Sequence, residues 1–512
     1  MSQPGGHFTA VKHHGLITIS IMAATMMQAL DTTIANVALP YMQGTFSVAQ
    51  DQVTWVLTSY IVAAAIATPL TGWLATSFGT KRVFVLSIVG FTIASALCGI
   101  AGSIYQIVFY RLVQGICGAA LVPLAQSVLL EINPPAHQGR AMAIWGVGVM
   151  LGPILGPTLG GWLTEHYSWR YVFYINVPIG ILATFGLALF LHESRQNRRS
   201  FDFFGFAMLS LGIGALQMML DRGELKDWFG STEILVELGL AIAGFWIFLV
   251  HAATAKNSFI NLRIFKDWNF SAGQILMFLI AMVLYASTAL LPTLLQELYN
   301  YPVETAGWLM TPRGIGTMGS MMIVGRLTTR YDARLLMLVG FAIGAYGFWL
   351  PTGWTLEMGW WPIAWAGIAQ GVGMGLIFVP LSLSSFGTLA PQLRNEGTAI
   401  YSLVRNIGGS IGISIAEAYL ANSIQANHQT LATHVSPFNS ALRMPDIAAI
   451  WNLHTASGLG ALNAEVTRQA TMIAYLDAFM MMTVLTVCAV PLLMLLRRID
   501  PRRGRGGPAA AE

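Results

Sequence analysis

Charged side chains are scarce in this sequence. Only 10% of its 512 residues are Asp, Glu, Lys or Arg, whereas 55% are hydrophobic. Soluble domains carry about 25% charged residues, so too little charge is present to cover a water-exposed surface of this size. The net charge of +4 is also too small to indicate nucleic-acid binding. The composition therefore excludes an ordinary soluble enzyme and predicts that most of the chain lies in a lipid bilayer.

Cysteines and nucleotide-binding motifs are also lacking. Cys98, Cys117 and Cys488 each lie in an apolar segment, with neither a metal-site spacing nor a Cys-x-x-Cys motif. We interpret them as small buried residues and expect neither a metal nor another cofactor. None of the five lysines follows a glycine, so the chain lacks the Gly-Lys pair of a P-loop and does not bind ATP by that route.

Long apolar segments are present, and they predict fourteen membrane-spanning helices. A helix needs about 20 apolar residues to cross a bilayer. Apolar segments of about this length or more lie at 15–39, 53–75, 83–101, 104–130, 141–163, 172–191, 203–220, 234–251, 270–298, 305–327, 361–386, 398–420 and 472–496, and a shorter one lies at 335–350. The first is too long for a cleaved signal peptide and contains an aspartate, so we interpret it as a retained span. The even number places both termini on the same side.

The basic residues predict the orientation of these spans. With both termini in the cytoplasm, nineteen Lys and Arg residues fall in cytoplasmic segments, five fall outside and three lie within spans. This bias follows the positive-inside rule and predicts cytoplasmic termini. One polar loop, 421–471, is long and lies on the outside. It is interpreted either as a flexible connector or as a docking site for an extracytoplasmic partner.

An internal repeat divides the chain into two halves. Gly72, Leu74, Phe78 and Lys81 in the loop after span two recur as a glycine, a leucine, an aromatic and a basic residue in the loop after span ten, which begins at Gly325. The fourth spans of the two halves match as well, since each has Gln-Gly followed by a proline. We therefore predict an all-α integral membrane protein with two pseudo-symmetric six-helix bundles and two inserted helices, an arrangement typical of rocking-type transporters. The predicted units are 1–200, 201–256, 257–499 with the outer loop 421–470, and a cytoplasmic tail at 500–512.

Ionisable residues inside spans are the candidate functional groups, because they are costly in a bilayer unless paired, protonated or hydrated. Asp31 in span one and Arg111 in span four are predicted at similar depth, near the outer side. Burial raises the pKa of a carboxyl and a nearby arginine lowers it, so a movable arginine would let the site bind and release a proton. A static ion pair that fixes helix packing is the alternative. Further candidates for the substrate path are Arg313, Arg405, Glu417, Gln28, Asn36 and Gln114.

Span five carries the most specific local pattern. It has glycines at every fourth position, with two prolines among them: Gly148, Gly152, Pro153, Gly156, Pro157 and Gly160. Such spacing leaves a bare groove on one helix face, so another helix can approach closely. The prolines remove backbone donors and bend the helix. We predict a packing seam, and we hypothesise that it also serves as a gate.

The loop after span two combines tight-turn glycines with a basic pair. Gly72 and Gly79 precede Lys81 and Arg82 at a predicted cytoplasmic helix end. A cation there is able to bind a helix C-terminus. Orientation by positive charge alone is the other interpretation.

Taken together, these motifs resemble the major facilitator superfamily, and more narrowly its fourteen-span EmrB/QacA-type drug:proton antiporters. The likeness covers essentially the whole chain. It is carried by LDTTIANVALP at 30–40, RLVQGICGAA at 111–120, GVMLGPILGPTLGG at 148–161 and SWRYVFYINVPIG at 168–180. In this superfamily the fourth-span arginine is implicated in proton coupling, and the fifth-span motif is typical of antiporters. The long last outer loop resembles the EmrB branch.

The resemblance implies proton-driven efflux of lipophilic or amphipathic drugs across the bacterial inner membrane, by alternating access around a midplane cavity. Proteins of this branch work with a periplasmic membrane-fusion adaptor of the EmrA type and an outer-membrane channel. The expected partners are therefore these proteins, small-molecule substrates, protons and the lipid bilayer. The spanning arginines make weak-acid or neutral amphiphiles as plausible as cations.

One position departs from the superfamily pattern. The loop after span two usually carries Asp and Arg, where Thr76 and Ser77 stand here, so the usual charge contact in this loop is missing. A loop without the Asp also resembles EmrB-type members. Two other functions stay open: a dedicated exporter of one metabolite, such as a siderophore or lipid-like compound, and a non-transporting membrane scaffold or sensor. No nucleophile–base pair indicates an enzyme, and no charged ring indicates a channel.

Overall fold

The computed structural model describes residues 13–193, 200–255, 258–436, 442, 444, 447, 450–453 and 455–497, and every regular element in them is helical. The N-terminal half comprises α1 (His14–Phe46), α2 (Gln50–Val53), α3 (Trp55–Ala67), α4 (Leu70–Phe78), α5 (Thr80–Ile100), α6 (Ile104–Gly118), α7 (Leu121–Ile132), α8 (Pro135–His166), α9 (Tyr171–Tyr174) and α10 (Asn176–Phe190). The inserted elements are α11 (Phe203–Arg222), η1 (Glu224–Lys226), η2 (Trp228–Gly230) and α12 (Thr232–Thr254). The C-terminal half comprises η3 (Leu262–Lys266), α13 (Trp268–Thr293), η4 (Leu294–Leu298), α14 (Val303–Leu327), α15 (Ala333–Trp349), η5 (Leu350–Gly353), α16 (Trp360–Gly387), η6 (Pro391–Leu393), α17 (Arg394–Thr433), α19 (Ala456–Cys488) and η8 (Pro491–Leu495). The predicted tail at 500–512 lies outside the described residues.

The number of spanning helices agrees with the prediction once two polar helices are included. Among the described residues, eleven helices are long and apolar enough to cross a membrane, and the bent pair α3 and α4 makes a twelfth. The other two predicted spans are α14 and α17, with 25 and 40 residues. Both exceed the length needed, but Arg313 and Arg405 make them less apolar. They lie inside the bundle, where α14 packs on α8 and α16, and α17 packs on α13 and α19.

Two predicted spans are broken rather than continuous. Span two bends by 53° between α3 and α4, where Pro69 lacks the N–H that would continue the helix. The Thr68 hydroxyl donates to the carbonyl of Ala64 at 2.6 Å, which stabilises the end of α3. Span four is interrupted at residues 119 and 120, between α6 and α7, without a bend as sharp as that of span two. Hydropathy locates a span but not a break inside it.

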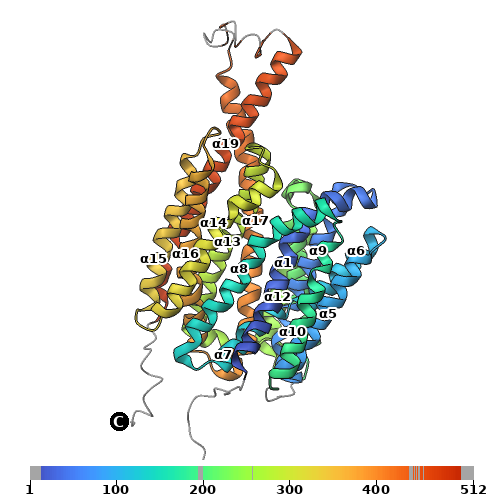
Figure 1. Cartoon of the computed structure of the whole chain (residues 1–512), viewed down its shortest axis with the longest axis vertical. Helices are drawn as coiled ribbons and strands as arrows, with labels where there is room; N and C mark the ends of the chain where they lie inside the picture. Colours follow the sequence, from blue (N-terminus) through green and yellow to red (C-terminus); the bar gives the residue numbers. More distant parts are fainter. Residues whose placement is uncertain are drawn as a thin grey trace, which may run out of the picture.

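The two halves lie side by side and touch mainly along two lines (Figure 1). On one line, α8 of the N-terminal half packs against α14 of the C-terminal half. On the other, the first turns of α17 pack against α4 and α7. The inserted helix α11 lies beside this second line, because it contacts both α3 and α17. Its Gln217 accepts a hydrogen bond from the Ser410 hydroxyl at 3.0 Å, and its Asp221 accepts one from the Thr58 hydroxyl.

Asp202 holds the inserted helices α11 and α12 together at the end opposite Gln217 and Asp221. Its carboxylate accepts hydrogen bonds from the backbone N–H of Gly205 at 2.8 Å, from that of Phe259 at 3.0 Å and from the His251 ring at 2.9 Å. Burial alone would raise the pKa of Asp202, but these hydrogen bonds outweigh it and hold the pKa below its ordinary value of 3.8. The start of α11, the end of α12 and the chain leading to α13 are therefore joined at one charged group.

Replacing Asp202 by asparagine is expected to lower the melting temperature of the detergent-solubilised protein near neutral pH. Asparagine keeps one acceptor oxygen but loses the charge, and hydrogen bonds to a charged group contribute about 1.5–3 kcal/mol each. Because the folded-state pKa is depressed, the wild-type advantage is complete above 3.8 and falls as the pH drops through the lowered pKa. Melting curves of both proteins across the acid range test this. An advantage that persists unchanged in acid would contradict it.

Residues 421–433 and 456–471 are not the polar loop that their composition suggested. Helix α17 continues to Thr433, and α19 begins at Ala456. The two form an antiparallel hairpin that projects beyond the rest of the bundle (Figure 1). The flexible-connector interpretation is wrong for these two helical segments. Hydropathy missed the hairpin because two helices that cover each other need only a narrow apolar seam, here including the buried Leu462, with His428 and Asn463 hydrogen-bonded at 3.0 Å.

Candidate functional site

Asp31 and Arg111 meet inside the N-terminal half, as their predicted depths suggested. Asp31 lies on α1 and is 0% exposed, and Arg111 lies on α6 and is 1% exposed. The Arg111 Nη1 atom donates to the Asp31 Oδ2 atom at 2.5 Å. A single charge is costly in a low-dielectric interior, so the two side chains compensate each other as a pair.

The guanidinium of Arg111 is held by more than the carboxylate. Its Nε donates to the backbone carbonyl of Val56 on α3 at 3.0 Å, and its Nη1 also donates to the Gln114 Oε1 atom at 2.8 Å. The guanidinium carbon lies 4.2 Å from the centre of the Tyr60 ring, a cation–π distance. Gln28 is linked to Arg111 only through Tyr60, because its amide donates to the Tyr60 hydroxyl at 3.4 Å.

Asn176 is a member of this site that the sequence analysis missed. Its Nδ2 donates to the Asp31 Oδ1 atom at 2.8 Å and to the Ser95 hydroxyl oxygen at 2.9 Å. Gln114 donates to the same Asp31 oxygen at 2.8 Å. Asn176 is a neutral polar residue in an apolar span, like the predicted Gln28, Asn36 and Gln114, and it lies in the motif at 168–180. These two features are the signal that was available for it in the sequence.

The motif at 168–180 has a structural explanation in its first residues as well. The Arg170 guanidinium donates to the carbonyls of Gly99 and Ala101 at 3.1 and 2.8 Å, at the C-terminal end of α5. A cation at this position satisfies carbonyls that have no partner in the helix and interacts favourably with the helix dipole. Because Ser95 lies on the last turns of α5, this contact also helps to fix the helix that supports Asn176.

The glycine seam of α8 lies against α1 at the level of Asp31. A Cβ atom at Gly152 would lie 2.6 Å from the Ala29 carbonyl carbon and 2.7 Å from the Leu30 nitrogen. The four seam glycines all face α1: Gly148 faces Met22, Gly152 faces Ala29, Gly156 faces Thr33 and Gly160 faces Ile34. Pro157 lies in the same helix, and the side chain of Pro153 is outside the described part. The seam lies within one half, and it positions the helix that carries the buried carboxylate.

The loop motif at Gly72 contacts the other half through its backbone. A Cβ atom at Gly72 would lie 2.9 Å from the Glu396 Cα atom and 3.1 Å from the Asn395 carbonyl oxygen, at the start of α17. The Asn395 side chain accepts a hydrogen bond from the Ser127 hydroxyl of α7. The halves are thus in contact at this end of the bundle through a bare glycine. Gly72, Thr76 and Ser77 lie in helix α4 (Leu70–Phe78) and not in the predicted loop.

Gly79, Lys81 and Arg82 contact the end of α10 rather than the other half. Gly79 has a φ of +96°, a conformation that a side chain disfavours. The Lys81 backbone N–H donates to Glu193 at 3.1 Å, and the Arg82 Nε lies 3.6 Å from the same carboxylate. Arg82 is largely exposed, so this ion pair contributes little stability. The basic pair therefore tethers two segments of its own half.

The other predicted path residues do not join the Asp31 site. Arg313 on α14 donates to the Ser287 hydroxyl at 2.8 Å, and its buried Nη1 atom has no hydrogen-bond partner among the described residues. The buried Nε of Arg405 on α17 likewise has none there. Glu417 and Asn36 are exposed on α17 and α1. Of the six candidates, only Gln114 contacts Asp31 and Arg111 directly.

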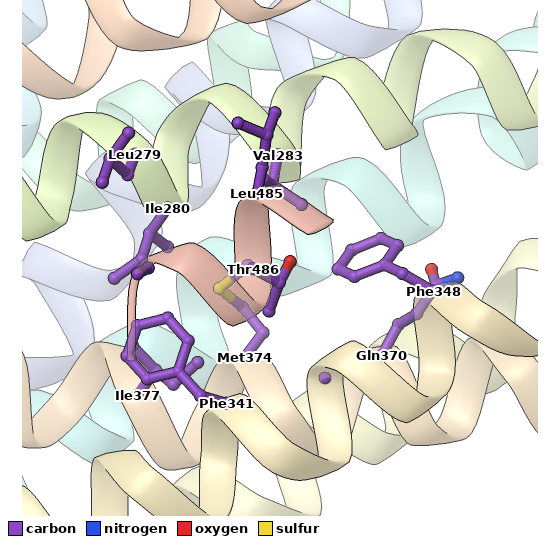
Figure 2. Close-up of a pocket in the computed structure, with 12 residues that line it drawn as sticks. Leu279, Ile280, Val283, Phe341, Phe348, Gln370, Met374, Ile377, Leu485 and Thr486 are labelled. Atoms are coloured by element: carbon purple, nitrogen blue, oxygen red, sulfur yellow. The ribbon is translucent and has the colours of Figure 1, made fainter. Parts of the chain in front are cut away.

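A pocket in the C-terminal half is too small for a drug-sized ligand. Its volume is about 20 Å³, and its apolar lining comes from α13, α15, α16 and α19 (Figure 2). That is room for about one water molecule, whereas ligand sites commonly enclose about 300–1,000 Å³. Gln370, whose Oε1 has no partner among the described residues, is one of the few polar groups that line it. This pocket belongs to the packing of one half and is not the predicted midplane cavity.

Two paired helical halves, with a buried ionisable pair inside one of them, define a secondary transporter. The sequence matches the model of the Major Facilitator Superfamily over residues 21–413. It is 36% identical over 475 residues to the multidrug export protein EmrB of Escherichia coli (strain K12), covering 91% of this chain and 92% of the relative. It is 34% identical over 497 residues to the fatty acid resistance protein FarB of Neisseria gonorrhoeae, covering 96% and 97%. The chain belongs to the Major Facilitator Superfamily, in the branch of these export proteins.

Solved structures support the same fold. The human organic anion transporter MFSD10 superimposes with a TM-score of 0.59 at 13% identity, covering 92% of this chain and 99% of that one. A bacterial homolog of the human lysosomal transporter Spinster, inward-facing and unoccupied, gives 0.54 at 19% identity, covering 98% and 100%. The predicted fold class and family are confirmed.

Proposed function

We propose that this protein exports lipophilic or amphipathic compounds in exchange for protons, and that Asp31 carries the proton. The observation that supports this most directly is the buried Asp31–Arg111 pair, with its oxygens 2.5 to 2.8 Å from their donors. An ionisable group at such a depth is costly to maintain and commonly marks an ion pathway. The similarity to EmrB, a multidrug export protein, supports the export direction and the range of substrates.

The proposed cycle uses the contacts between the halves. In this conformation α17 closes against α4 and α7 at the Gly72 end, which we propose faces the cytoplasm. Protonation of Asp31 from outside removes the negative charge beside Arg111 and weakens the strongest contact between α1 and α6. We propose that this loosening favours the opposite opening, in which substrate binds from the cytoplasm or inner leaflet. Loss of the proton to the cytoplasm restores the pair.

Anionic amphiphiles are the substrate class that the C-terminal half favours. Arg313 and Arg405 each keep a guanidinium N–H with no acceptor in the described part of the chain. Such donors in a desolvated position suit a carboxylate or phenolate. The relative FarB is a fatty acid resistance protein, a name that agrees with this class. We therefore propose weak lipophilic acids among the substrates.

The location and the partners of the exporter complete the proposal. The distribution of basic residues supports cytoplasmic termini in a bacterial inner membrane. The hairpin of α17 and α19 would then project outward, where a membrane-fusion adaptor of the EmrA type could bind it and lead to an outer-membrane channel. The units 1–200, 201–256 and 257–499 would move as the two halves and their inserted pair.

Asp31→Asn is expected to abolish proton-driven export. Asparagine keeps an oxygen that Arg111 can donate to but cannot take up a proton, so it mimics the protonated state permanently. Purified protein in liposomes with an acidic lumen should accumulate dyes and lipophilic acids in the wild type, and the variant should match protein-free vesicles. The protein-free vesicles also correct for passive partition of weak acids. A variant with full pH-driven accumulation and an unchanged melting temperature would exclude the proton role of Asp31.

A further inference from the structure

Asn176, which donates a hydrogen bond to the candidate proton site Asp31, carries a side-chain oxygen that accepts none from the described residues. Asn176 is 0% exposed, and its Oδ1 has no hydrogen-bond partner among the described residues, although its Nδ2 makes two hydrogen bonds. A buried carbonyl without a partner is unfavourable, because it has given up its hydrogen bonds to water. Buried polar atoms in this condition often have a partner in another state of the protein.

The surroundings of Asp31 suit only its ionised form. Its two oxygens face N–H donors from Arg111, Gln114 and Asn176. The other titratable groups that interact with this carboxyl are Tyr60 on α3 and Cys98 on α5. A proton added to the carboxyl would point at another donor unless one donor withdraws, because a protonated acid needs an acceptor for its O–H.

We propose that Asn176 is a positioning residue that turns its amide when Asp31 is protonated. Rotation by half a turn about its side chain places Oδ1 where Nδ2 now lies. The new O–H of Asp31 then donates to Asn176 Oδ1, while Gln114 still donates to the same carboxyl oxygen. The Ser95 hydroxyl, which now donates to the Phe173 carbonyl at 2.9 Å, turns to donate to Oδ1 as well.

The amide makes two hydrogen bonds in either orientation. With Asp31 ionised, Asn176 donates to Asp31 and Ser95. With Asp31 protonated, it accepts from the same two groups. The proton is thus taken up without leaving the carboxyl O–H opposed to a donor, and Arg111 keeps the Val56 carbonyl and Gln114 as acceptors. This inference rests on the proposed proton role of Asp31 and specifies how the protonated state is accommodated.

Infrared difference spectroscopy between acid and alkaline samples of the full-length protein tests the rotation directly. With the amide carbonyl of asparagine isotopically labelled, the wild type should show a carbonyl band that moves to lower frequency as Asp31 is protonated. That band should be absent in Asn176→Leu and in Asp31→Asn. A carboxylic acid band for Asp31 without any shift of the labelled carbonyl would overturn the proposal.

The pH profile of transport supplies a second readout. Asn176→Asp places a second carboxyl beside Asp31, and two carboxyls that share a site raise one pKa strongly, so the midpoint should move by about one pH unit or more to alkaline values. Asn422→Asp, which adds the same charge at an exposed position of the outer hairpin, should leave the midpoint in place. An unmoved midpoint in folded Asn176→Asp and Asn176→Leu protein overturns the positioning role. If Asp31→Asn still transports protons, the proposed function fails instead.

A second, independent feature is a groove at one end of the contact between α8 and α14. A groove of about 520 Å³ lies between the first turns of α8 and the last turn of α14, lined by His137 and Arg140 on one side and by Arg326, Thr329 and Arg330 on the other. No carboxylate is among the described residues that line it. The remaining lining is mainly apolar and includes the exposed Ile323.

We propose that this groove binds the phosphate headgroup of an anionic phospholipid. Three guanidinium groups suit a phosphate, and none has an ion pair or hydrogen bond through its side chain in the described part of the chain. The neighbouring apolar surface suits an acyl chain. Because α8 and α14 belong to different halves and touch closely at Gly139 and Gly325, a lipid bound across them would favour the state in which these helix ends are together.

The test compares the wild type with Arg140→Gln/Arg326→Gln/Arg330→Gln in bilayer discs of phosphatidylethanolamine, with and without phosphatidylglycerol. Phosphatidylglycerol should raise the melting temperature of the wild type and not that of the triple variant. Arg263→Gln/Lys266→Gln, which removes charge outside the groove, should respond like the wild type. If inorganic phosphate alone raises the melting temperature as much as phosphatidylglycerol does, the groove binds a free anion and the lipid proposal is wrong. Equal responses of wild type and triple variant would overturn the site.

Discussion

Arg111→Leu is expected to unfold much of the protein, whereas the double variant Asp31→Asn/Arg111→Leu is expected to fold and yet not transport. Removing the cation alone leaves the Asp31 carboxyl without its counter-ion in an interior where it is 0% exposed. Breaking a buried ion pair from one side costs about 3–5 kcal/mol, while replacing both partners by neutral groups often costs little. The order of stability should be wild type, double variant, then single variant.

Transport separates the electrostatic role of the pair from its structural role. The double variant has no group at this site that titrates, so a pH gradient should drive no accumulation even though the protein is folded. Arg111→Lys keeps the charge but has a single nitrogen, which cannot match the separate Nε and Nη1 contacts to Val56 and Asp31. The Arg111→Lys protein should therefore fold stably but transport slowly.

Melting curves in detergent and gradient-driven uptake in liposomes measure the two quantities separately. If Arg111→Leu alone proves as stable as the double variant, the two residues do not stabilise each other as charges, and the pair is not what sets the proton affinity of Asp31.

The sequence was sufficient to find the charged part of this site because a charge in an apolar span is conspicuous. Asp31 and Arg111 were selected by that single property, and in the structure the Arg111 Nη1 atom lies 2.5 Å from the Asp31 Oδ2 atom. Asn176 and Ser95 were not selected although the neutral Gln28, Asn36 and Gln114 were, because neutral polar side chains are common in membrane helices and the sequence does not say which of them meets the ionisable pair. Their importance arises from the packing of α10 against both α1 and α5, which composition does not encode.

The differences in the fold have a related cause. Hydropathy detects apolar helices, and it located all the predicted spans, including 305–327 and 398–420, although α14 and α17 are too polar to count among the eleven most apolar helices. It also placed the ends of α17 and α19 at the membrane surface, although both continue into the hairpin. A helix that covers another helix in water needs neither a long apolar run nor a capping signal at the membrane surface.

Gly152→Ala is expected to impair transport more than it impairs folding. The added methyl group would lie 2.6 Å from the Ala29 carbonyl carbon and 2.7 Å from the Leu30 nitrogen, distances at which backbone atoms have to separate. Overpacking of this kind costs about 1–3 kcal/mol. The segment of α1 that would move is the one immediately before Asp31, whose contacts to Arg111 and Asn176 are 2.5 and 2.8 Å long.

Gly161→Ala is the matched control, because it adds the same methyl group to the same helix where nothing lies within 4 Å. Replacing glycine by alanine in a helix is otherwise favourable by about 1 kcal/mol, so this variant should be as stable as the wild type or more so, and equally active. The comparison uses uptake rates at saturating substrate together with melting temperatures. A Gly152→Ala protein with wild-type uptake would mean that α1 and α8 can separate without moving Asp31, and the seam would then be ordinary helix packing. A large loss of uptake with a small loss of stability would instead show that close contact at this glycine holds the carboxylate where Arg111 can reach it.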